Sequence, residues 1–370
     1  MKASFLCENV DKKLSFVNHA VSQRSQLPIL LNFHIQAKKG NLIIKATDLE
    51  IGIQVSIPAN VEQEGEATVP ARAFYDLLSN VQKGIIFLAT KDNNLIFGTD
   101  KIKTVFQTTP AGEFPKIYEE KGGKIATIPE ETIEKEFSSV VFAASPDPGR
   151  PALSGVLIKK ISGGKEGFLM VATDGFRLSL RGTQNKNTES DGGFVVPARI
   201  IKELSFMKDN KDVGVYVSKK GNQILFEQEG SILVGRLIEA KFPNYQKIIP
   251  QDFSTRAEFD KTEFQSAVKT CAVFAREAAN IIKLSILKNK IKVWASAPSL
   301  GETEIDVDAE VLGEENEIAF NARYLLEFLS NIEGEVMVFE MAGPLNPGVF
   351  KLKDDPSFLH IIMPIRLQAQ

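Results

Sequence analysis

The fold is decided by a short phrase that occurs three times, each time ahead of an apolar stretch with helical spacing: Val69-Pro70-Ala71-Arg72, Val196-Pro197-Ala198-Arg199 and Phe320-Asn321-Ala322-Arg323. Successive arginines are 127 and then 124 residues apart. Other landmarks keep nearly the same step, because Ala46-Thr47-Asp48 returns as Ala172-Thr173-Asp174 and Phe114-Pro115 returns as Phe242-Pro243. Several landmarks in one order at one offset predict three copies of a single domain.

Within each repeat the apolar pattern changes its period in the same order. A helix comes first, strands follow, a second helix begins at the shared phrase, and further strands close the repeat. Two helices against a mostly antiparallel sheet make an α+β domain. We therefore expect three tandem α+β repeats over residues 1–122, 123–251 and 252–370, with linkers near 119–124 and 251–255. The expected helices are residues 10–24, 71–81, 130–144, 198–208, 261–276 and 322–331, and strand-like runs include 42–46, 168–172, 224–226, 231–234 and 291–294.

The composition is that of a globular protein, with 43% apolar and 25% charged residues. No apolar run approaches the ~20 residues that span a bilayer, and the first residues lack the sustained apolar stretch of a signal peptide. We therefore expect a soluble, cytoplasmic protein with no membrane segment. Cys7 and Cys271 lie in apolar segments of different repeats, which favours two buried free thiols over a disulfide or a metal site.

The sequence lacks the common motifs of enzymes: it has three histidines, and no His-x-x-x-His, Cys-x-x-Cys, Walker loop or Gly-x-Ser-x-Gly. Asp48 and Asp174 are open to two interpretations. They could be metal ligands of a nuclease, or each could end a strand and fix the following turn through its own side chain. A turn is copied whenever its domain is duplicated, whereas an active site seldom is. We therefore favour the turn-forming role of the two aspartates. We expect that the protein is not an enzyme and binds no metal or cofactor. A carbohydrate-binding or scaffold protein is a further alternative.

Six segments, in order along the chain, carry a resemblance to a known family. They are Leu27-Pro28-Ile29-Leu30, Ala46-Thr47-Asp48-Leu49-Glu50, Thr68-Val69-Pro70-Ala71-Arg72, Ala172-Thr173-Asp174-Gly175-Phe176-Arg177-Leu178, Lys241-Phe242-Pro243-Asn244-Tyr245 and Met363-Pro364-Ile365-Arg366-Leu367. The chain resembles the bacterial DNA sliding clamp, the beta subunit of DNA polymerase III, over essentially its whole length.

This resemblance implies a processivity factor: a head-to-tail homodimeric ring of six domains that encircles double-stranded DNA without reading its sequence. It also implies that the replicative polymerase, the clamp loader and repair proteins bind through short linear motifs, and that the protein works in the cytoplasm at the nucleoid during replication. Charge supports a positive lining, because the six expected helical segments sum to +3 and the rest of the chain to −6. The segment 130–144 departs from this pattern with a net charge of −3.

Three sets of site residues follow from the resemblance. The candidate DNA contacts are Lys12, Lys13, Arg24, Arg72, Arg150, Arg199, Lys202 and Lys269. The walls of the partner-peptide pocket are expected to be Leu153, Thr173, Gly175, Phe176, Arg177, Leu178, Pro243, Lys247, Ile248, Ile362, Met363, Pro364, Ile365 and Arg366. The apolar members could instead fill the interdomain core. The candidate dimer contacts are Phe106 on one side and Val273 and Phe274 on the other.

The chain also departs from the family pattern in three places. Pro151-Ala152 stands where aromatic residues are familiar, which puts base stacking at that loop in doubt. Phe176 replaces a familiar histidine, and Gln368-Ala369-Gln370 extends beyond the usual terminus. We expect Phe176 to alter which side chains of a bound peptide the pocket prefers, and the terminal extension to reach past the pocket.

Overall fold

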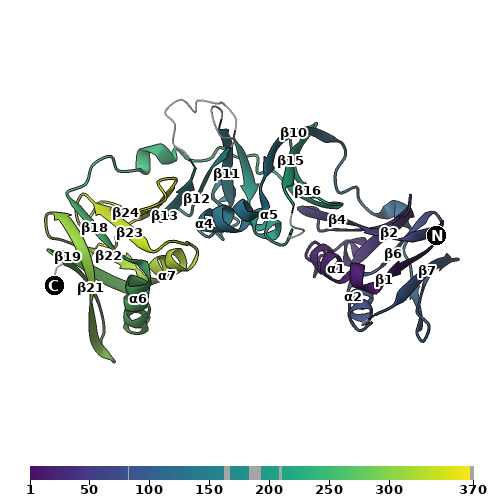
Figure 1. The fold of residues 1–370 in the computed structure, drawn as a ribbon, viewed down its shortest axis with the longest axis horizontal. Coiled ribbons are helices and arrows are strands. Elements are labelled where there is room, and N and C mark those ends of the chain that lie inside the picture. Colours follow the sequence, from purple (N-terminus) through teal and green to yellow (C-terminus); the bar gives the residue numbers. More distant parts are fainter. Residues whose placement is uncertain (82, 162–166, 183–192, 208–210, 367–370) are drawn as a thin grey trace. The chain divides into compact units, whose positions relative to one another are not determined.

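The computed structural model describes residues 1–81, 83–161, 167–182, 193–207 and 211–366. The chain forms two compact units. Unit 1 contains Met1–Glu131 and Arg199–Leu237, and unit 2 contains Thr132–Ala198 and Ile238–Gln370. Each unit therefore combines one terminal repeat with part of the middle repeat. Figure 1 shows the elements of both units.

Unit 1 contains two antiparallel sheets in its described part. The first has the strand order β5 (Asn60–Gln63), β1 (Lys2–Leu6), β7 (Ile85–Lys91), β8 (Asn94–Gly98) and β9 (Lys103–Gln107). The second has the order β10 (Lys121–Ile128), β15 (Val213–Ser218), β16 (Gln223–Gln228), β17 (Ser231–Arg236), β4 (Ile51–Pro58), β3 (Asn41–Thr47), β2 (Asn32–Lys38) and β6 (Gly65–Pro70). Pairing of β17 with β4 makes strands of the first and middle repeats part of one sheet.

The helices of unit 1 bury one apolar face each. They are α1 (Asp11–Asn18), α2 (Ala71–Ser79) and α5 (Ala198–Leu204), and α1 packs on α2. Phe74 of α2 is fully buried, and its ring centroid lies 6.3 Å from that of Phe33 and 6.1 Å from that of Phe97. This helix therefore joins the two sheets of unit 1 through a single aromatic cluster.

Unit 2 contains one long antiparallel sheet in its described part. Its strand order is β14 (Phe194–Pro197), β11 (Gly155–Ile161), β12 (Gly167–Thr173), β13 (Arg177–Arg181), β25 (Phe358–Ile362), β24 (Gly348–Leu352), β23 (Val336–Met341), β18 (Thr255–Asp260), β21 (Gly301–Gly313), β20 (Lys290–Ala297), β19 (Ile281–Leu287) and β22 (Asn316–Asn321). The pairing of β13 with β25 joins the middle repeat to the last one.

The helices of unit 2 differ in regularity. The long α6 (Lys261–Ala275) begins regularly, because Asp260 accepts a hydrogen bond of 2.7 Å from the backbone N–H of Glu263. It packs beside α7 (Ala322–Ser330). The segment expected as a helix over 130–144 is instead α3 (Glu130–Thr132), a π-turn (Ile133–Phe137) and α4 (Ser138–Val141).

The shared phrase lies at the same place in each repeat. Each copy ends a strand and begins a helix, so that Arg72, Arg199 and Arg323 are the second residues of α2, α5 and α7. This confirms the predicted triplication at its defining motif, and the α+β class is confirmed as well. Asn321 takes the place of the two prolines, and its side chain accepts a hydrogen bond of 2.9 Å from the Arg323 N–H.

Two details of the expected layout need correction. The first helix ends at Asn18 rather than near residue 24, because Ser22 and Ser25 hydrogen-bond to nearby backbone groups and so favour a turn. The linker expected over 119–124 is mostly strand, since β10 begins at Lys121 and pairs with β15. The linker expected near 251–255 is confirmed, since residues 251–254 form neither helix nor strand and β18 begins at Thr255.

Both cysteines are buried free thiols, as expected. Burial raises the pKa of Cys271 to about 11. No helix in the described part of the chain is long and apolar enough to cross a membrane.

Candidate nucleic-acid and peptide interface

The repeated Thr-Asp pair builds the same turn in two repeats. In the first, the Thr47 hydroxyl donates to the Ile51 carbonyl at 2.7 Å and accepts from the Leu49 N–H at 3.0 Å. The Asp48 carboxylate accepts from the N–H groups of Glu50 and Ile51 at 3.0 and 2.9 Å. Because the side chain satisfies the backbone of its own turn, the turn-forming interpretation of Asp48 is confirmed.

The second copy repeats these bonds. Thr173 donates to the Arg177 carbonyl at 2.6 Å, and the Asp174 carboxylate accepts from the N–H groups of Phe176 and Arg177 at 2.9 and 3.0 Å. Neither aspartate belongs to a metal-ligand group, since the described residues contain no cluster of three or more His, Cys, Asp or Glu side chains able to hold a metal ion.

A buried arginine anchors this second turn to the last repeat. Arg177 is 7% exposed, and its guanidinium lies 3.0 Å from the Asp174 carboxylate and 2.6 Å from that of Glu327 on α7. It also donates to the Phe142 carbonyl at 2.9 Å and lies over the ring of Tyr324. Burial alone would raise the pKa of Glu327, but the hydrogen bonds and charges of Arg177 and, to a smaller extent, Arg323 outweigh burial and hold that pKa below its ordinary value.

The turn presents apolar side chains to solvent beside the end of the last strand. Phe176 is 57% exposed, and Met363 and Ile248 are 38% exposed. The Met363 N–H donates to the Phe176 carbonyl at 2.8 Å, so these two residues are held together. Tyr245 and Ile249, which flank Ile248, pack in the buried cluster beneath. We call Phe176, Ile248 and Met363 the unit 2 apolar surface.

Other members of the expected pocket lie around or beneath this surface. Gly175, Pro243, Lys247 and Arg366 are exposed, whereas Leu153, Pro364 and Ile365 are half-buried. Four members are buried: Leu178 and Ile362 lie in the cores of unit 2, Thr173 bonds within its turn, and Arg177 is enclosed by its ion pairs. The core-filling alternative therefore holds for Leu178 and Ile362, because period-two alternation turns these side chains inward.

Arg150 lies beside the unit 2 apolar surface. Its guanidinium donates to the Asp174 carbonyl at 3.1 Å and pairs with the Asp147 carboxylate at 3.2 Å. A Cβ atom placed on Gly175 would lie 3.5 Å from the Arg150 Nη1. We predicted Arg150 as a DNA contact. The structure holds its guanidinium at the repeated turn, just ahead of the short helix Pro151–Leu153.

The other candidate DNA contacts fall into two groups. Lys12, Arg24, Lys202 and Lys269 are exposed and form no ion pair with any described residue, and Arg72 is 96% exposed with only a 4.0 Å approach to Asp76. The remaining two are engaged within unit 1. Arg199 pairs with Asp48 and donates to the His19 carbonyl, and Lys13 donates to the Ser56 carbonyl at 3.1 Å.

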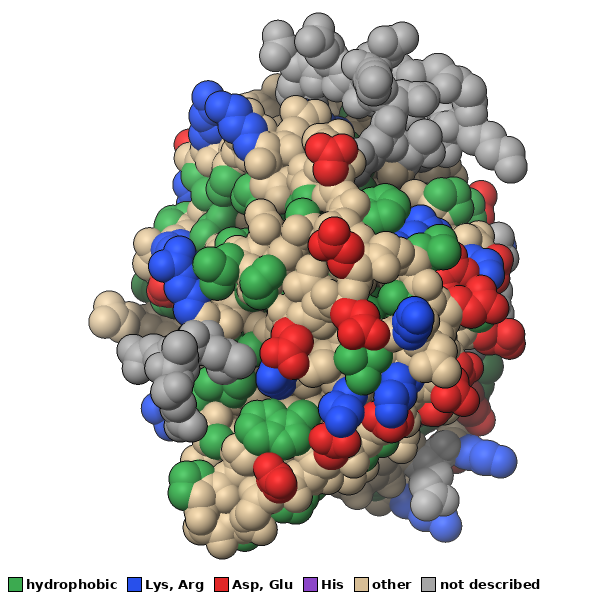
Figure 2. Space-filling view, turned by 90° about the vertical axis from the view of Figure 1, so that its left-hand side faces the viewer, with side chains coloured by type: hydrophobic (Ala, Val, Ile, Leu, Met, Phe, Trp, Pro, Cys, Tyr) green, Lys and Arg blue, Asp and Glu red, His purple; other side chains and the backbone are tan. Residues whose placement is uncertain are grey.

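Two lysines of the last repeat are paired across neighbouring strands. Lys290 lies 2.6 Å from Asp306, and Lys292 lies 2.6 Å from Glu304, both across β20 and β21. Figure 2 shows acidic and basic side chains intermixed on the face that it draws. Exposed cations without an ion pair to a described residue also occur on strands, as at Lys38, Lys91 and Lys103.

The candidate dimer contacts are only partly exposed. Phe106 is 9% exposed, and its ring packs 5.8 Å from Phe74, so it belongs to the core of unit 1. Its neighbour Val105 is 55% exposed on the same edge strand, β9. In unit 2, Val273 on α6 is 55% exposed, whereas Phe274 is half-buried against the core. The sequence alone could have indicated that Val105 is exposed if Phe106 is buried, because successive side chains of a strand point to opposite faces of the sheet.

Comparison with known proteins identifies the class. Three descriptions of DNA polymerase III beta subunit domains match in succession: the N-terminal domain over residues 1–118, the central domain over 127–244 and the C-terminal domain over 246–366. These three matches in succession cover most of the chain.

Relatives and solved structures agree with this class. The chain is 30% identical to the beta sliding clamp of Synechocystis over 96% of each chain. It superposes on the DNA polymerase sliding clamp of Bacillus subtilis with a TM-score of 0.92 and 26% identity, covering all of both chains. It superposes on the C. crescentus beta sliding clamp, crystallised with PEG bound to its putative beta-motif tethering region, with a TM-score of 0.90 and 27% identity over 99% of each chain. The chain belongs to the family of bacterial beta sliding clamps and is a processivity clamp of DNA replication.

Proposed function

We propose that two copies of this chain close head to tail into a ring around duplex DNA and hold it without reading its sequence. The observation that carries this proposal is a set of exposed cations on an acidic chain, Lys12, Arg24, Arg72, Lys202 and Lys269. Among the described residues only Arg72 of this set approaches a carboxylate, that of Asp76 at 4.0 Å. Phosphate contacts from such side chains release counterions, which makes binding sensitive to salt and indifferent to base sequence.

The ring closes between the exposed edge of the first repeat and α6 of the last repeat. Strand β9 is paired only with β8 among the described strands, so its other edge offers free backbone donors and acceptors. Val105 and Val273 supply exposed apolar side chains to this contact. The interface is heterologous, and two copies close it by symmetry.

Partners dock on the unit 2 apolar surface. Phe176, Ile248 and Met363 supply apolar contact area, and methionine adapts its shape to different ligands. Arg150, Lys247 and Arg366 surround them with positive charge, which suits peptides that combine leucine or phenylalanine with an acidic or carbonyl-rich flank. We assign the replicative polymerase, clamp loader and repair proteins to this surface.

The protein acts in the cytoplasm at the DNA and has no catalytic activity of its own. The turn-forming roles of Asp48 and Asp174 support this, because they leave neither carboxylate arranged for metal-dependent hydrolysis. The three functional domains are residues 1–122, 123–251 and 252–370. Incubation with magnesium and DNA tests the absence of nuclease activity, since any cleavage would contradict it.

Topological binding is tested on nicked circular DNA. We expect the loaded chain to stay on the circle through gel filtration and to leave after a single restriction cut, because a ring slides off a free end. Retention after linearisation would contradict the ring, and loss from the intact circle at low salt would contradict encirclement.

Peptide docking is tested with Phe176→Ala. Anisotropy of a labelled partner peptide should show binding about ten-fold weaker, because a phenylalanine contributes most of its burial energy at such a site. Phe253→Ala is the matched control, since Phe253 is an exposed phenylalanine of unit 2 at 49%. Equal affinities for the two variants would place the docking surface elsewhere.

A further inference from the structure

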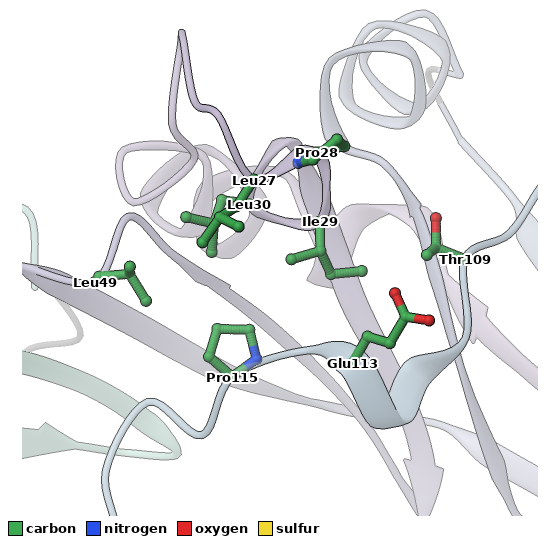
Figure 3. Close-up of a pocket in the computed structure, with 8 residues that line it drawn as sticks. All are labelled: Leu27, Pro28, Ile29, Leu30, Leu49, Thr109, Glu113 and Pro115. Carbon is green, nitrogen blue, oxygen red and sulfur yellow. The ribbon is translucent and has the colours of Figure 1, made fainter.

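Unit 1 contains an open cavity of about 470 Å³ that none of the roles above uses. Its apolar walls come from Pro28, Ile29, Leu49 and Pro115, and Figure 3 shows these side chains around a common space. Glu113 is the only charged side chain among the described lining residues. The space is large enough for two or three side chains of a peptide.

The cavity occupies the place in the first repeat that the peptide surface occupies in the second. The short helix Pro28–Leu31 corresponds to Pro151–Leu153, and both have proline at the start. At the repeat offset, Leu49 matches Gly175 in the Thr-Asp turn, and Pro115 matches Pro243. The three chain segments that line the cavity thus have counterparts in the second repeat.

The backbone of this cavity is held in place before any ligand binds. The Leu30 N–H donates to the Leu27 carbonyl at 3.1 Å, and the Leu30 carbonyl accepts from the Ser22 N–H at 3.3 Å. On the opposite wall, the Thr68 hydroxyl donates to the Thr109 carbonyl at 2.6 Å. A preformed cavity lowers the entropic cost of binding.

Leu49 is the second observation that points to a ligand. Its φ is +78°, a left-handed conformation that leucine rarely adopts, and its side chain is 52% exposed. The matching position in the second repeat is Gly175 at φ +94°, where this conformation carries no steric cost. In the first repeat, the large apolar side chain of Leu49 is thus kept in a costly backbone conformation although little of it is buried. Strained residues of this kind gather at binding sites.

The two repeats differ in the charge around these sites. Arg150, Lys247 and Arg366 surround the unit 2 apolar surface, whereas exposed Glu113 lines the cavity and exposed Glu50 follows Leu49. Exposed Lys116 likewise follows Pro115, so the charge of the lining itself is that of the Glu113 carboxylate, which favours a cation on the ligand.

We propose that this cavity is a second peptide-binding site, for a short apolar segment that carries a lysine or arginine. The apolar side chains of the segment fill the space between Ile29, Leu49 and Pro115, and its cation lies near the Glu113 carboxylate. The repeat comparison rests on the peptide site proposed for unit 2, but the cavity, the strained Leu49 and the charge of Glu113 do not.

The test uses the full chain and two labelled, end-blocked hexapeptides, Leu-Lys-Leu-Leu-Lys-Phe and Leu-Glu-Leu-Leu-Glu-Phe. We expect the basic peptide to bind more tightly in fluorescence anisotropy. It should shift the leucine methyl NMR signals of Leu27, Leu30 and Leu49. No binding of the basic peptide at about 1 mM, equal binding of both peptides, or shifts confined to unit 2 would overturn the proposal.

Variants separate the two sites. Leu49→Gly gives the first repeat the glycine of the second and removes the strain, so it should fold while binding the basic peptide about ten-fold more weakly. Glu113→Lys should reverse the preference between the peptides. Phe176→Ala should leave this binding unchanged. Unaltered affinity for the basic peptide in both cavity variants would refute the site. If Phe176→Ala did not weaken the binding of partner peptides, that result would refute only the docking surface proposed for unit 2.

Discussion

Two arginines pair with the same carboxylate. Comparing the stability lost when each of them is replaced tests how unit 2 is held together. Arg177 and Arg323 both contact Glu327, at 2.6 and 3.0 Å. Their surroundings differ, because the Arg177 side chain is 6% exposed and the Arg323 side chain is 76% exposed. Arg177→Ala also leaves Asp174 without its partner.

The expected magnitudes follow from this difference in burial. Removing one partner of a buried ion pair costs about 3–5 kcal/mol, and we expect the lower end because the Glu327 side chain is 35% exposed. Arg323→Ala should cost about 0.5 kcal/mol, the value of an exposed pair between residues four apart on a helix. The gap between the two variants is therefore about 2.5 kcal/mol.

Urea unfolding followed by tryptophan fluorescence measures both losses, because Trp294 is the only tryptophan of the chain and lies in β20 of unit 2. The pH adds a second check. The pKa of Glu327 is lowered from 4.5, so its contribution is complete above 4.5 and disappears as the pH falls through the lowered folded value. The deficit of Arg177→Ala should shrink in this acidic range. Equal losses for the two variants at neutral pH would refute this account.

Four further results are expected. Changing Arg24 and Lys202 to alanine should weaken DNA binding and reduce the slope of log affinity against log salt by about two, with peptide affinity unchanged; a slope that stays the same would remove both from the DNA contacts. Deleting residues 363–370 should weaken partner peptides strongly and leave the dimer intact in sedimentation, and peptide binding at full strength would show that the docking surface is misplaced. Val105→Glu should shift the dimer toward monomer without unfolding, because a charge buried in an apolar contact is costly; an undisturbed dimer would argue against the β9 edge. Burial keeps the pKa of His360 well below 6.5, so unfolded chains take up the proton first and stability should fall as the pH drops below 6.5, by up to about 1.4 kcal/mol per unit; His360→Gln should reduce that slope, and an unchanged slope would assign it to other groups.

Most of the fold was predictable because the chain repeats itself. A motif that recurs in order at one offset reports the domain, whatever the local propensities say, and the strand-to-helix junctions at Arg72, Arg199 and Arg323 follow from it. Local chemistry still decided some boundaries, as where Ser22 and Ser25 turn the chain away from α1. The turn roles of Asp48 and Asp174 were also readable, since aspartate bonds to its own backbone neighbours.

The candidate sites were less predictable, because exposure is decided by tertiary packing. The sequence shows that Leu178, Ile362 and Phe106 are apolar, but it does not show which of them are exposed. A side chain in a sheet faces solvent or the core according to what covers that face of the sheet. Charge has the same limitation. Arg199 and Arg24 look alike in sequence, yet the first is engaged by Asp48, which is 151 residues away, and the second is exposed.

By itself, therefore, the sequence determined the repeat, the α+β class, the family and the turns, because these depend on residues close together in the chain or on recurring order. Only the tertiary structure decided which cations are unpaired, which apolar side chains are exposed, and that Leu49 lines a cavity with Pro115. The physical reason is that burial and ion pairing depend on neighbours brought together by folding, and those neighbours are far apart in the sequence.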